Sequence, residues 1–83
     1  MRIVFSNNSK KQLRKLNVRI QQKILFILEK LKDNQKVDII KLKNKEQEFR
    51  IRIGNYRVQL QKIDNDFLIT HIGKRENFYL MLI

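Results

Sequence analysis

The pattern of apolar and polar positions along the chain predicts one short strand, two helices and three further strands. Residues 2–5 alternate in the manner of a strand, with Ile3 and Phe5 on one side. The next segment is basic, and Leu13 and Leu16 give it an apolar edge at helical spacing. A second apolar stripe follows it, so we expect a pair of helices after the first strand.

Both predicted helices have recognisable ends. Ser9 and Gln12 fit a capping box, in which the serine oxygen accepts an N–H group at the helix start and the glutamine reaches back. Asn17 is expected to end the first helix and to cap the second, which stops near residues 33–34. The apolar stripe of the second helix consists of Ile20, Ile24, Ile27, Leu28 and Leu31. The two helices therefore form a hairpin with a shared apolar face.

The second half of the chain predicts strands. Residues 37–45 have no clear period, and we interpret them as a loop. Residues 47–53 and 56–63 alternate, and the Gly-Asn pair between them is a two-residue hairpin signal because both residue types tolerate left-handed backbone. The nearly continuous apolar run 67–72 predicts a strand inside the sheet, reached through the turn 64–66.

Together these segments predict an α+β fold. The N-terminal strand and the two-helix hairpin precede antiparallel strands that form one sheet, and the helices pack on one face of that sheet. The chain of 83 residues is expected to be a single domain, 1–83. The apolar tail 78–83 is not assigned to a strand or a helix.

Charge and cysteine content narrow the classes of function. The 19 lysines and arginines against 8 acidic residues give a net charge of +11, which favours a polyanion or an acidic protein as partner. With no cysteine and one histidine, a disulfide framework, a thiolate nucleophile and a zinc site are excluded, and we expect no cofactor. The start of the chain lacks a signal-peptide core, and no apolar run is long enough for a bilayer, so a cytoplasmic location without membrane contact is expected.

Arginine is unevenly distributed along the chain. Arg50 and Arg52 alternate with the apolar residues of one predicted strand, and the hairpin brings Arg57 of the next strand to the same outward face. Arginine offers a planar set of donors that matches phosphate, whereas lysine is the usual solvated surface cation. The alternative is a solvated basic sheet face without a ligand.

Other chemistry-bearing side chains fit structural roles more simply. His71 lies within an apolar run, which favours a packed strand histidine over a general base. Glu46 and Glu48 flank a basic strand and are expected to form solvent-screened ion pairs. Tyr56 begins a strand and is expected to pack, whereas Tyr79 follows Arg75 closely and is the better candidate for a site.

Two motifs carry a resemblance to a known family. The strand pair FRIRIGNYR (residues 49–57) and the segment GKRENFY (residues 73–79), together with the order of elements, resemble the RelE/ParE superfamily of toxin–antitoxin toxins. The resemblance covers most of the chain and implies a small toxin neutralised by a cognate antitoxin in a hetero-oligomer. RelE-like members enter the ribosomal A site and cut mRNA, whereas ParE-like members poison DNA gyrase.

The resemblance assigns the catalytic residues one by one. Arg50 and Arg52 match basic strand residues of RelE-like nucleases, and Arg57 matches the arginine of their YR pair. Arg75 and Tyr79 match the arginine and the tyrosine of the C-terminal motif. Some members have lysine where Arg50 and Arg52 stand, and arginine is a poor base because it effectively keeps its proton.

Metal-independent RNA cleavage requires a base for the 2′-hydroxyl, charge stabilisation at phosphorus and an acid for the 5′-oxygen. The arginines meet the second need. Tyr79 is the candidate base or nucleotide-positioning residue, and Arg75 is a candidate clamp or weak proton donor. The resemblance therefore implies a ribosome-dependent mRNA endoribonuclease of the RelE-like branch. A ParE-like gyrase inhibitor and a non-catalytic RNA-binding module are the alternatives.

Overall fold

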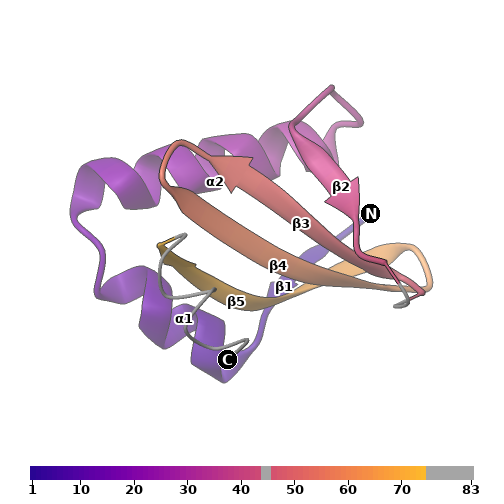
Figure 1. Ribbon diagram of the computed structural model, residues 1–83, viewed down its shortest axis with the longest axis horizontal. Helices are drawn as coiled ribbons and strands as arrows, with labels where there is room; N and C mark the ends of the chain where they lie inside the picture. The colour runs from indigo at the N-terminus through magenta and orange to yellow at the C-terminus, as the bar shows by residue number, and fades with distance from the viewer. Residues whose placement is uncertain (44–45, 75–83) are drawn as a thin grey trace.

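The computed structural model describes residues 1–43 and 46–74. Two helices and five strands make up this part of the chain, and their order is shown in Figure 1. In sequence order they are β1 (Ile3–Phe5), α1 (Asn7–Arg14), α2 (Val18–Lys32), β2 (Ile39–Lys41), β3 (Glu48–Ile53), β4 (Tyr56–Ile63) and β5 (Asp66–Lys74).

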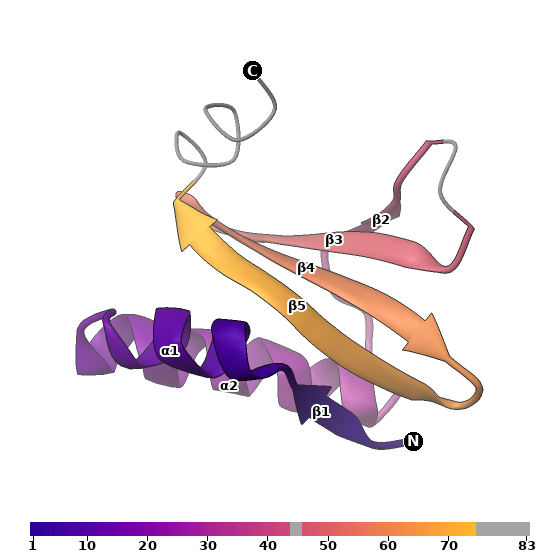
Figure 2. The same cartoon turned by 90° about the horizontal axis from the view of Figure 1, so that it is seen from below.

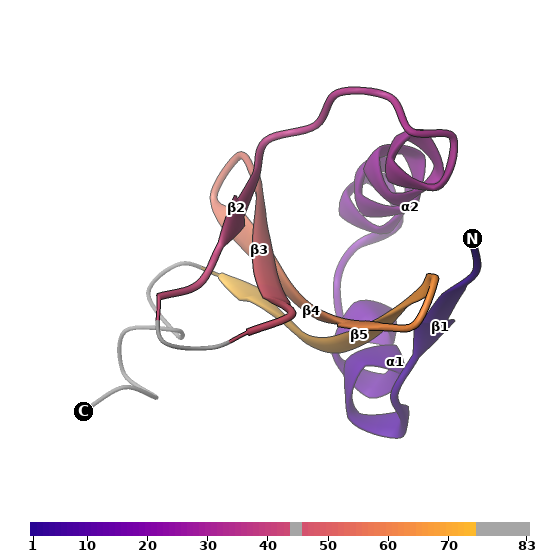
Figure 3. The same cartoon turned by 90° about the vertical axis from the view of Figure 1, so that its right-hand side faces the viewer.

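All the strands belong to one mixed sheet with the order β1-β5-β4-β3-β2. The neighbours from β2 to β5 run antiparallel, whereas β1 pairs with β5 in parallel. Both helices lie on the same side of the sheet, and the strands curve over them (Figures 2 and 3). The predicted α+β fold is thus confirmed, and β5 lies inside the sheet as expected.

The core lies between α2 and the sheet. Ile24 and Leu28 of the predicted helical stripe are buried and face residues such as Ile51 and Leu60 of the hairpin. Burying one such side chain contributes about 1.5 to 3 kcal/mol of transfer free energy. At the start of α2, the Asn17 side chain accepts a hydrogen bond from the Ile20 N–H group at 2.9 Å, as predicted for a capping residue.

The predicted capping box of the first helix is wrong. Helix α1 begins earlier, with Ser6 as its N-cap, and the Ser6 side chain accepts a hydrogen bond from the Ser9 N–H group at 3.1 Å. The Ser9 hydroxyl instead donates to the Ile69 carbonyl at 2.8 Å, and the Gln12 side chain accepts from the Ile72 N–H group at 2.7 Å. Strand β1 pairs with β5 only through Ile69, so these two side chains satisfy backbone groups along the rest of that edge.

The segment 37–45 also differs from its predicted loop. It contains β2, which pairs with β3 through Ile39 opposite Ile51 and Ile40 opposite Arg50. A strand of three residues is too short to show a period in the sequence. At the predicted hairpin turn between β3 and β4, Gly54 has a φ of 59°, a conformation that glycine adopts without steric cost.

A bulge interrupts the pairing of β4 and β5. Gln59 lies opposite His71, whereas Leu60 lies opposite Ile69, so Thr70 is the extra residue. As a result Ile69 and Ile72 both face the core, although regular alternation would place them on opposite faces of the strand. The Thr70 hydroxyl donates to the Gln59 carbonyl at 3.2 Å, which holds the bulge against β4.

Candidate functional site

The three arginines of the hairpin lie on the sheet face that points away from the helices, as predicted. Arg52 is directly opposite Arg57, and Arg50 is directly opposite Gln59. Ile51, which alternates with the arginines of β3, is fully buried under the helices. Side chains directly opposite each other on one face have Cβ atoms about 4.5 to 5.5 Å apart, so the guanidinium groups share one basic surface.

Exposure differs strongly among these arginines. The side chain of Arg52 is 52% exposed, whereas Arg57 as a residue is only 6% exposed. Arg50 is half-buried. A buried guanidinium is restricted in its rotamers and acts in a lower effective dielectric, which strengthens its attraction for an anion. The basic face therefore combines the exposed guanidinium group of Arg52 with the more buried, preorganised guanidinium groups of Arg50 and Arg57.

The pairing of Arg52 with Arg57 has an energetic cost. Like charges directly opposite each other destabilise a sheet. Arg52 also forms an ion pair with Asp38, with 3.5 Å between its Nε atom and the Asp38 Oδ2 atom, but both side chains are more than half exposed. Such a pair contributes about 0 to 1 kcal/mol.

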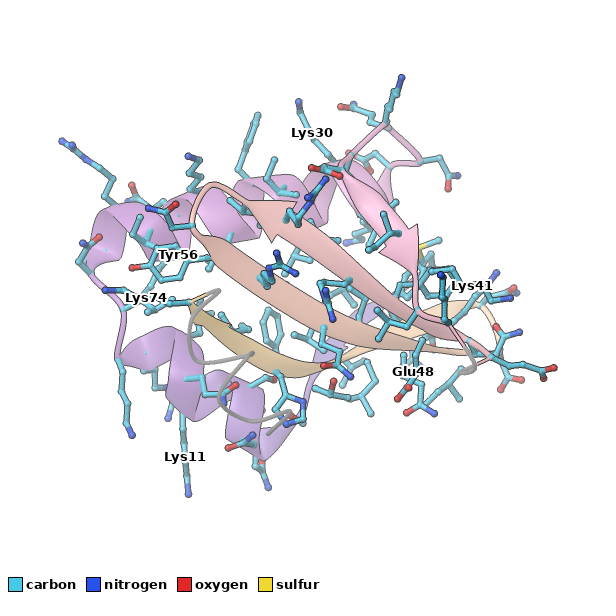
Figure 4. The ribbon with its side chains drawn as sticks, viewed as in Figure 1. Lys11, Lys30, Lys41, Glu48, Tyr56 and Lys74 are labelled. Atoms are coloured by element: carbon cyan, nitrogen blue, oxygen red, sulfur yellow. The ribbon has the colours of Figure 1, made fainter. Side chains whose placement is uncertain are left out.

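Other side chains mark the two ends of the sheet. Glu48 lies near one end, and Tyr56 and Lys74 lie near the other (Figure 4). Tyr56 is half-buried and directly opposite the buried Ile53, so it lies on the face that the helices cover, as expected for a packed strand residue. Gly73 is directly opposite Arg57, so β5 ends next to the arginines of the hairpin. Arg75 and Tyr79, the two remaining candidates, lie outside the described residues.

His71 is the residue of this face that sequence reasoning passed over. It is half-buried, as a packed histidine should be, but it lies opposite Gln59 on the outward face. Regular alternation from Phe67 and Ile69 would have placed it in the core, and only the bulge at Thr70 turns it outward. Nothing in the apolar run itself indicates a bulge.

An ion pair at the other end of β5 joins it to the N-terminus. The Arg2 side chain donates to the Asp66 Oδ2 atom at 2.9 Å, and the Arg2 backbone N–H group donates to the Oδ1 atom at 3.0 Å. These bonds lower the pKa of the Asp66 carboxyl from its usual value of 3.8, the side-chain bond contributing most. Asp66 directly precedes Phe67, the first residue of β5 that pairs with β1, so this contact helps to fix the register of β1 and is structural.

Two further findings concern the described residues only. No three histidine, cysteine or acidic side chains in residues 1–43 and 46–74 gather in a way that could hold a metal ion. Neither helix of this part of the chain is long and apolar enough to cross a membrane.

Known toxins of toxin–antitoxin systems are similar to this chain in sequence and in fold. A curated relative, Toxin RelE3 of Methanocaldococcus jannaschii, is 26% identical over 95% of this chain and 96% of its own length. The toxin–antitoxin complex RelB-RelE from Methanococcus jannaschii contains a chain with a TM-score of 0.85 and 25% identity, covering 96% of this chain and 99% of that one.

A second solved structure supports the fold alone. The RelE-RelB complex of Pyrococcus horikoshii contains a chain with a TM-score of 0.74 at 24% identity, over 89% of this chain and 93% of that one.

The family model described as ParE toxin of type II toxin-antitoxin system, parDE, matches residues 3–79. The resemblance indicated by the two sequence motifs is confirmed, and the chain belongs to this family of type II toxin–antitoxin toxins.

Proposed function

We propose that this toxin is a ribosome-dependent mRNA endoribonuclease that is neutralised by a cognate antitoxin. The observation that carries the proposal is the row of arginines on the open sheet face, with Arg52 and Arg57 directly opposite each other. The match to a RelE toxin over nearly the whole of both chains supports the mRNA-cleaving branch of the superfamily. The solved complexes of RelE with RelB support an antitoxin as the protein partner.

The reaction is an internal attack within the RNA. The 2′-hydroxyl oxygen bonds to the adjacent phosphorus, the bond from phosphorus to the 5′-oxygen breaks, and a 2′,3′-cyclic phosphate and a 5′-hydroxyl remain. Negative charge increases on the phosphoryl oxygens in the transition state. Arg50, Arg52 and Arg57 stabilise that charge, because guanidinium groups donate bidentate hydrogen bonds to phosphate.

Two C-terminal residues complete the proposed site. Arg75 acts as a further clamp on the phosphate, and Tyr79 takes a proton or positions a nucleotide by stacking. The arginines themselves do not act as bases, since a guanidinium effectively keeps its proton. The ribosome contributes by orienting the mRNA, and positioning of this kind can lower a barrier by several kcal/mol.

Primer extension on mRNA in a translating extract tests the proposal. The purified toxin should produce new 5′ ends, seen as shortened extension products, within codons in the ribosomal A site, and the antitoxin should suppress them. The upstream fragments should carry a cyclic or 3′-phosphate, and the downstream fragments a 5′-hydroxyl. Treatment of the toxin with EDTA, followed by restored magnesium for the ribosomes, should leave cleavage intact.

A gyrase assay on the same preparation addresses the alternative activity. The description of the matching family model names a ParE toxin. Inhibition of DNA supercoiling by gyrase is therefore the alternative activity to test. If the toxin inhibits supercoiling and leaves mRNA intact, the proposed nuclease activity is rejected in favour of gyrase inhibition. RNA binding that weakens steeply with salt, with neither activity, would indicate a non-catalytic RNA-binding protein.

The antitoxin is expected to supply an acidic, amphipathic segment. The net charge of +11 favours such a partner, and the apolar tail 78–83 offers a hydrophobic contact for it. This tail lies outside the described residues. Hydrogen exchange of the tail should slow when the antitoxin binds, and equal protection in free and bound toxin would remove the tail from the interface.

A further inference from the structure

The bulge in β5 brings a protonatable side chain to the arginine face. Thr70 is inserted between Ile69, which faces the core, and His71, which lies opposite Gln59 on the other face. Bulges are frequent beside active sites because the extra residue redirects the side chains that follow it. The Thr70 hydroxyl donates a hydrogen bond to the Gln59 carbonyl at 3.2 Å, and this bond stabilises the bulge.

His71 lies in the same cross-strand row as one of the proposed catalytic arginines. Gln59 is directly opposite His71 on one side and directly opposite Arg50 on the other. In the adjacent row, Arg57 lies between Arg52 and Gly73. The imidazole therefore shares one surface with the groups proposed to hold the scissile phosphate.

The state of the imidazole nitrogen is unusual for a structural histidine. The Nδ1 atom of His71 is buried and has no hydrogen-bond partner within the described part of the chain. Buried polar atoms almost always have a partner, and a catalytic role is one of the explanations for an exception. Because Nδ1 is buried, the other ring nitrogen, Nε2, is the atom that would donate a proton to the RNA.

The proposed reaction lacks a proton donor that matches its task. The leaving 5′-oxygen must receive a proton, and arginine is a very weak acid at neutral pH. Histidine is the side chain that binds and releases a proton most readily in this range. We propose, on the basis of the nuclease function proposed above, that His71 is the general acid that protonates the 5′-oxygen as it leaves phosphorus.

The proton balance of this step is complete. The imidazolium gives its proton to the 5′-oxygen while the bond from that oxygen to phosphorus breaks, and the electron pair of the bond remains on oxygen. The 2′-hydroxyl loses its own proton to the base on the opposite side of phosphorus. The neutral imidazole regains a proton from water before the next turnover, so no other reactant is required.

The charged side chains around His71 fit a role at the phosphate. On the same face of β3 and β4 they are Glu48, Arg50, Arg52 and Arg57. In the proposed site these arginines hold the phosphodiester on the face that the imidazole shares, where the leaving 5′-oxygen can receive a proton. Glu48 is one row further along the sheet, opposite Gln61, and is the competing proton carrier.

An mRNA with sulfur in place of the bridging 5′-oxygen provides the decisive test. A thiolate leaves without a proton, so the sulfur mRNA does not need a general acid. With ordinary mRNA, His71→Gln should lower the single-turnover cleavage rate on the ribosome by about 100- to 10,000-fold, the usual contribution of acid–base catalysis. With sulfur at the position that the wild-type protein cuts, the variant should reach the wild-type rate.

Two further variants sharpen the result. Gln61→Met changes a half-buried residue of the same face without removing a proton carrier, so any loss should be equal for the two mRNAs. Glu48→Gln should not be rescued selectively by sulfur. If His71→Gln folds poorly, His71→Asn serves in its place, and cleavage of the sulfur mRNA at the wild-type rate itself demonstrates a folded site.

The outcomes separate this inference from the function on which it rests. Absence of mRNA cleavage by the wild-type toxin rejects the nuclease and the role of His71 together. Wild-type cleavage combined with an unaffected His71→Gln variant rejects only the role of His71. An equal loss on both mRNAs also rejects it, because the defect would then not concern the leaving group.

Discussion

The two faces of the same sheet carry opposite properties. On the face that the helices cover, Ile51 and Val58 are fully buried and belong to the apolar core. On the other face, Arg52 and Arg57 lie opposite each other at a cost in stability. Because successive side chains of a strand point to opposite faces, one hairpin supplies both the core and the proposed site. The difference teaches that stability and activity can be altered independently in this small domain.

The largest effect is expected from the covered face. Leu28 is 3% exposed, and Leu28→Ala should lower the free energy of unfolding by about 2 to 5 kcal/mol through lost burial and a residual cavity. Denaturant unfolding measures this loss. Activity per folded molecule, determined well below the melting temperature, should stay at the wild-type level. A matching fall in that activity would show that the two faces are not independent.

The next effect concerns the open face. Arg57→Ala should lower mRNA cleavage by about 100-fold or more, because the variant loses a charge contact made in the transition state. Arg19→Ala, which removes an exposed arginine of α2, is the matched control for net charge and should cleave normally. Single-turnover kinetics and thermal melting are compared for both. Equal cleavage by the two variants would favour a role for overall charge rather than for this face.

Arg75 and Tyr79, the two C-terminal candidates, lie outside the described residues. Arg75→Ala and Tyr79→Phe should melt close to the wild-type temperature, because both residues are proposed to act on the RNA, and substitutions away from the core usually change stability by no more than about 0.5 kcal/mol. Both should fail to arrest growth or cut mRNA. Tyr79→Phe is the sharper variant because it keeps the ring and removes only the hydroxyl. Partial activity would make Tyr79 a stacking residue, and wild-type cleavage by both variants would contradict their assignment.

The smallest effect should come from the ion pair at the N-terminus, which belongs to neither face. The pKa of Asp66 is lowered below 3.8 by the hydrogen bonds from Arg2, so its contribution to stability is present above that pH and is lost as the pH falls through the lowered value. Asp66→Asn should therefore melt slightly earlier than wild type at neutral pH. The difference should shrink in strong acid, and mRNA cleavage should not change.

A difference between Asp66→Asn and wild type that is independent of pH would contradict this electrostatic account. The effect is expected to be small because the Arg2 side chain is 80% exposed and solvent screens the pair. Glu46→Gln, at an exposed residue outside the strands, is a control that removes one carboxylate. It should leave the melting temperature nearly unchanged across the same range.

Local pattern was sufficient for much of the fold and for part of the site. Strict alternation in residues 49–53 and a glycine at the turn placed Arg50, Arg52 and Arg57 on one face, as the register shows. The helical stripe from Ile24 to Leu31 likewise predicted the covered side. These features depend on the periods of the strand and the helix, which are properties of neighbouring residues.

Tertiary structure decided the features that depend on distant partners. Ser9 and Gln12 serve the edge of β5 rather than a capping box, because β1 leaves backbone groups of that edge unpaired. Strand β2 exists because β3 offers it a hydrogen-bonding edge. The bulge at Thr70 arises from the pairing of β4 with β5, and it places His71 beside the arginines. The periodicity of apolar residues along one segment contains no information about which backbone N–H and C=O groups of a distant segment lack a hydrogen-bond partner.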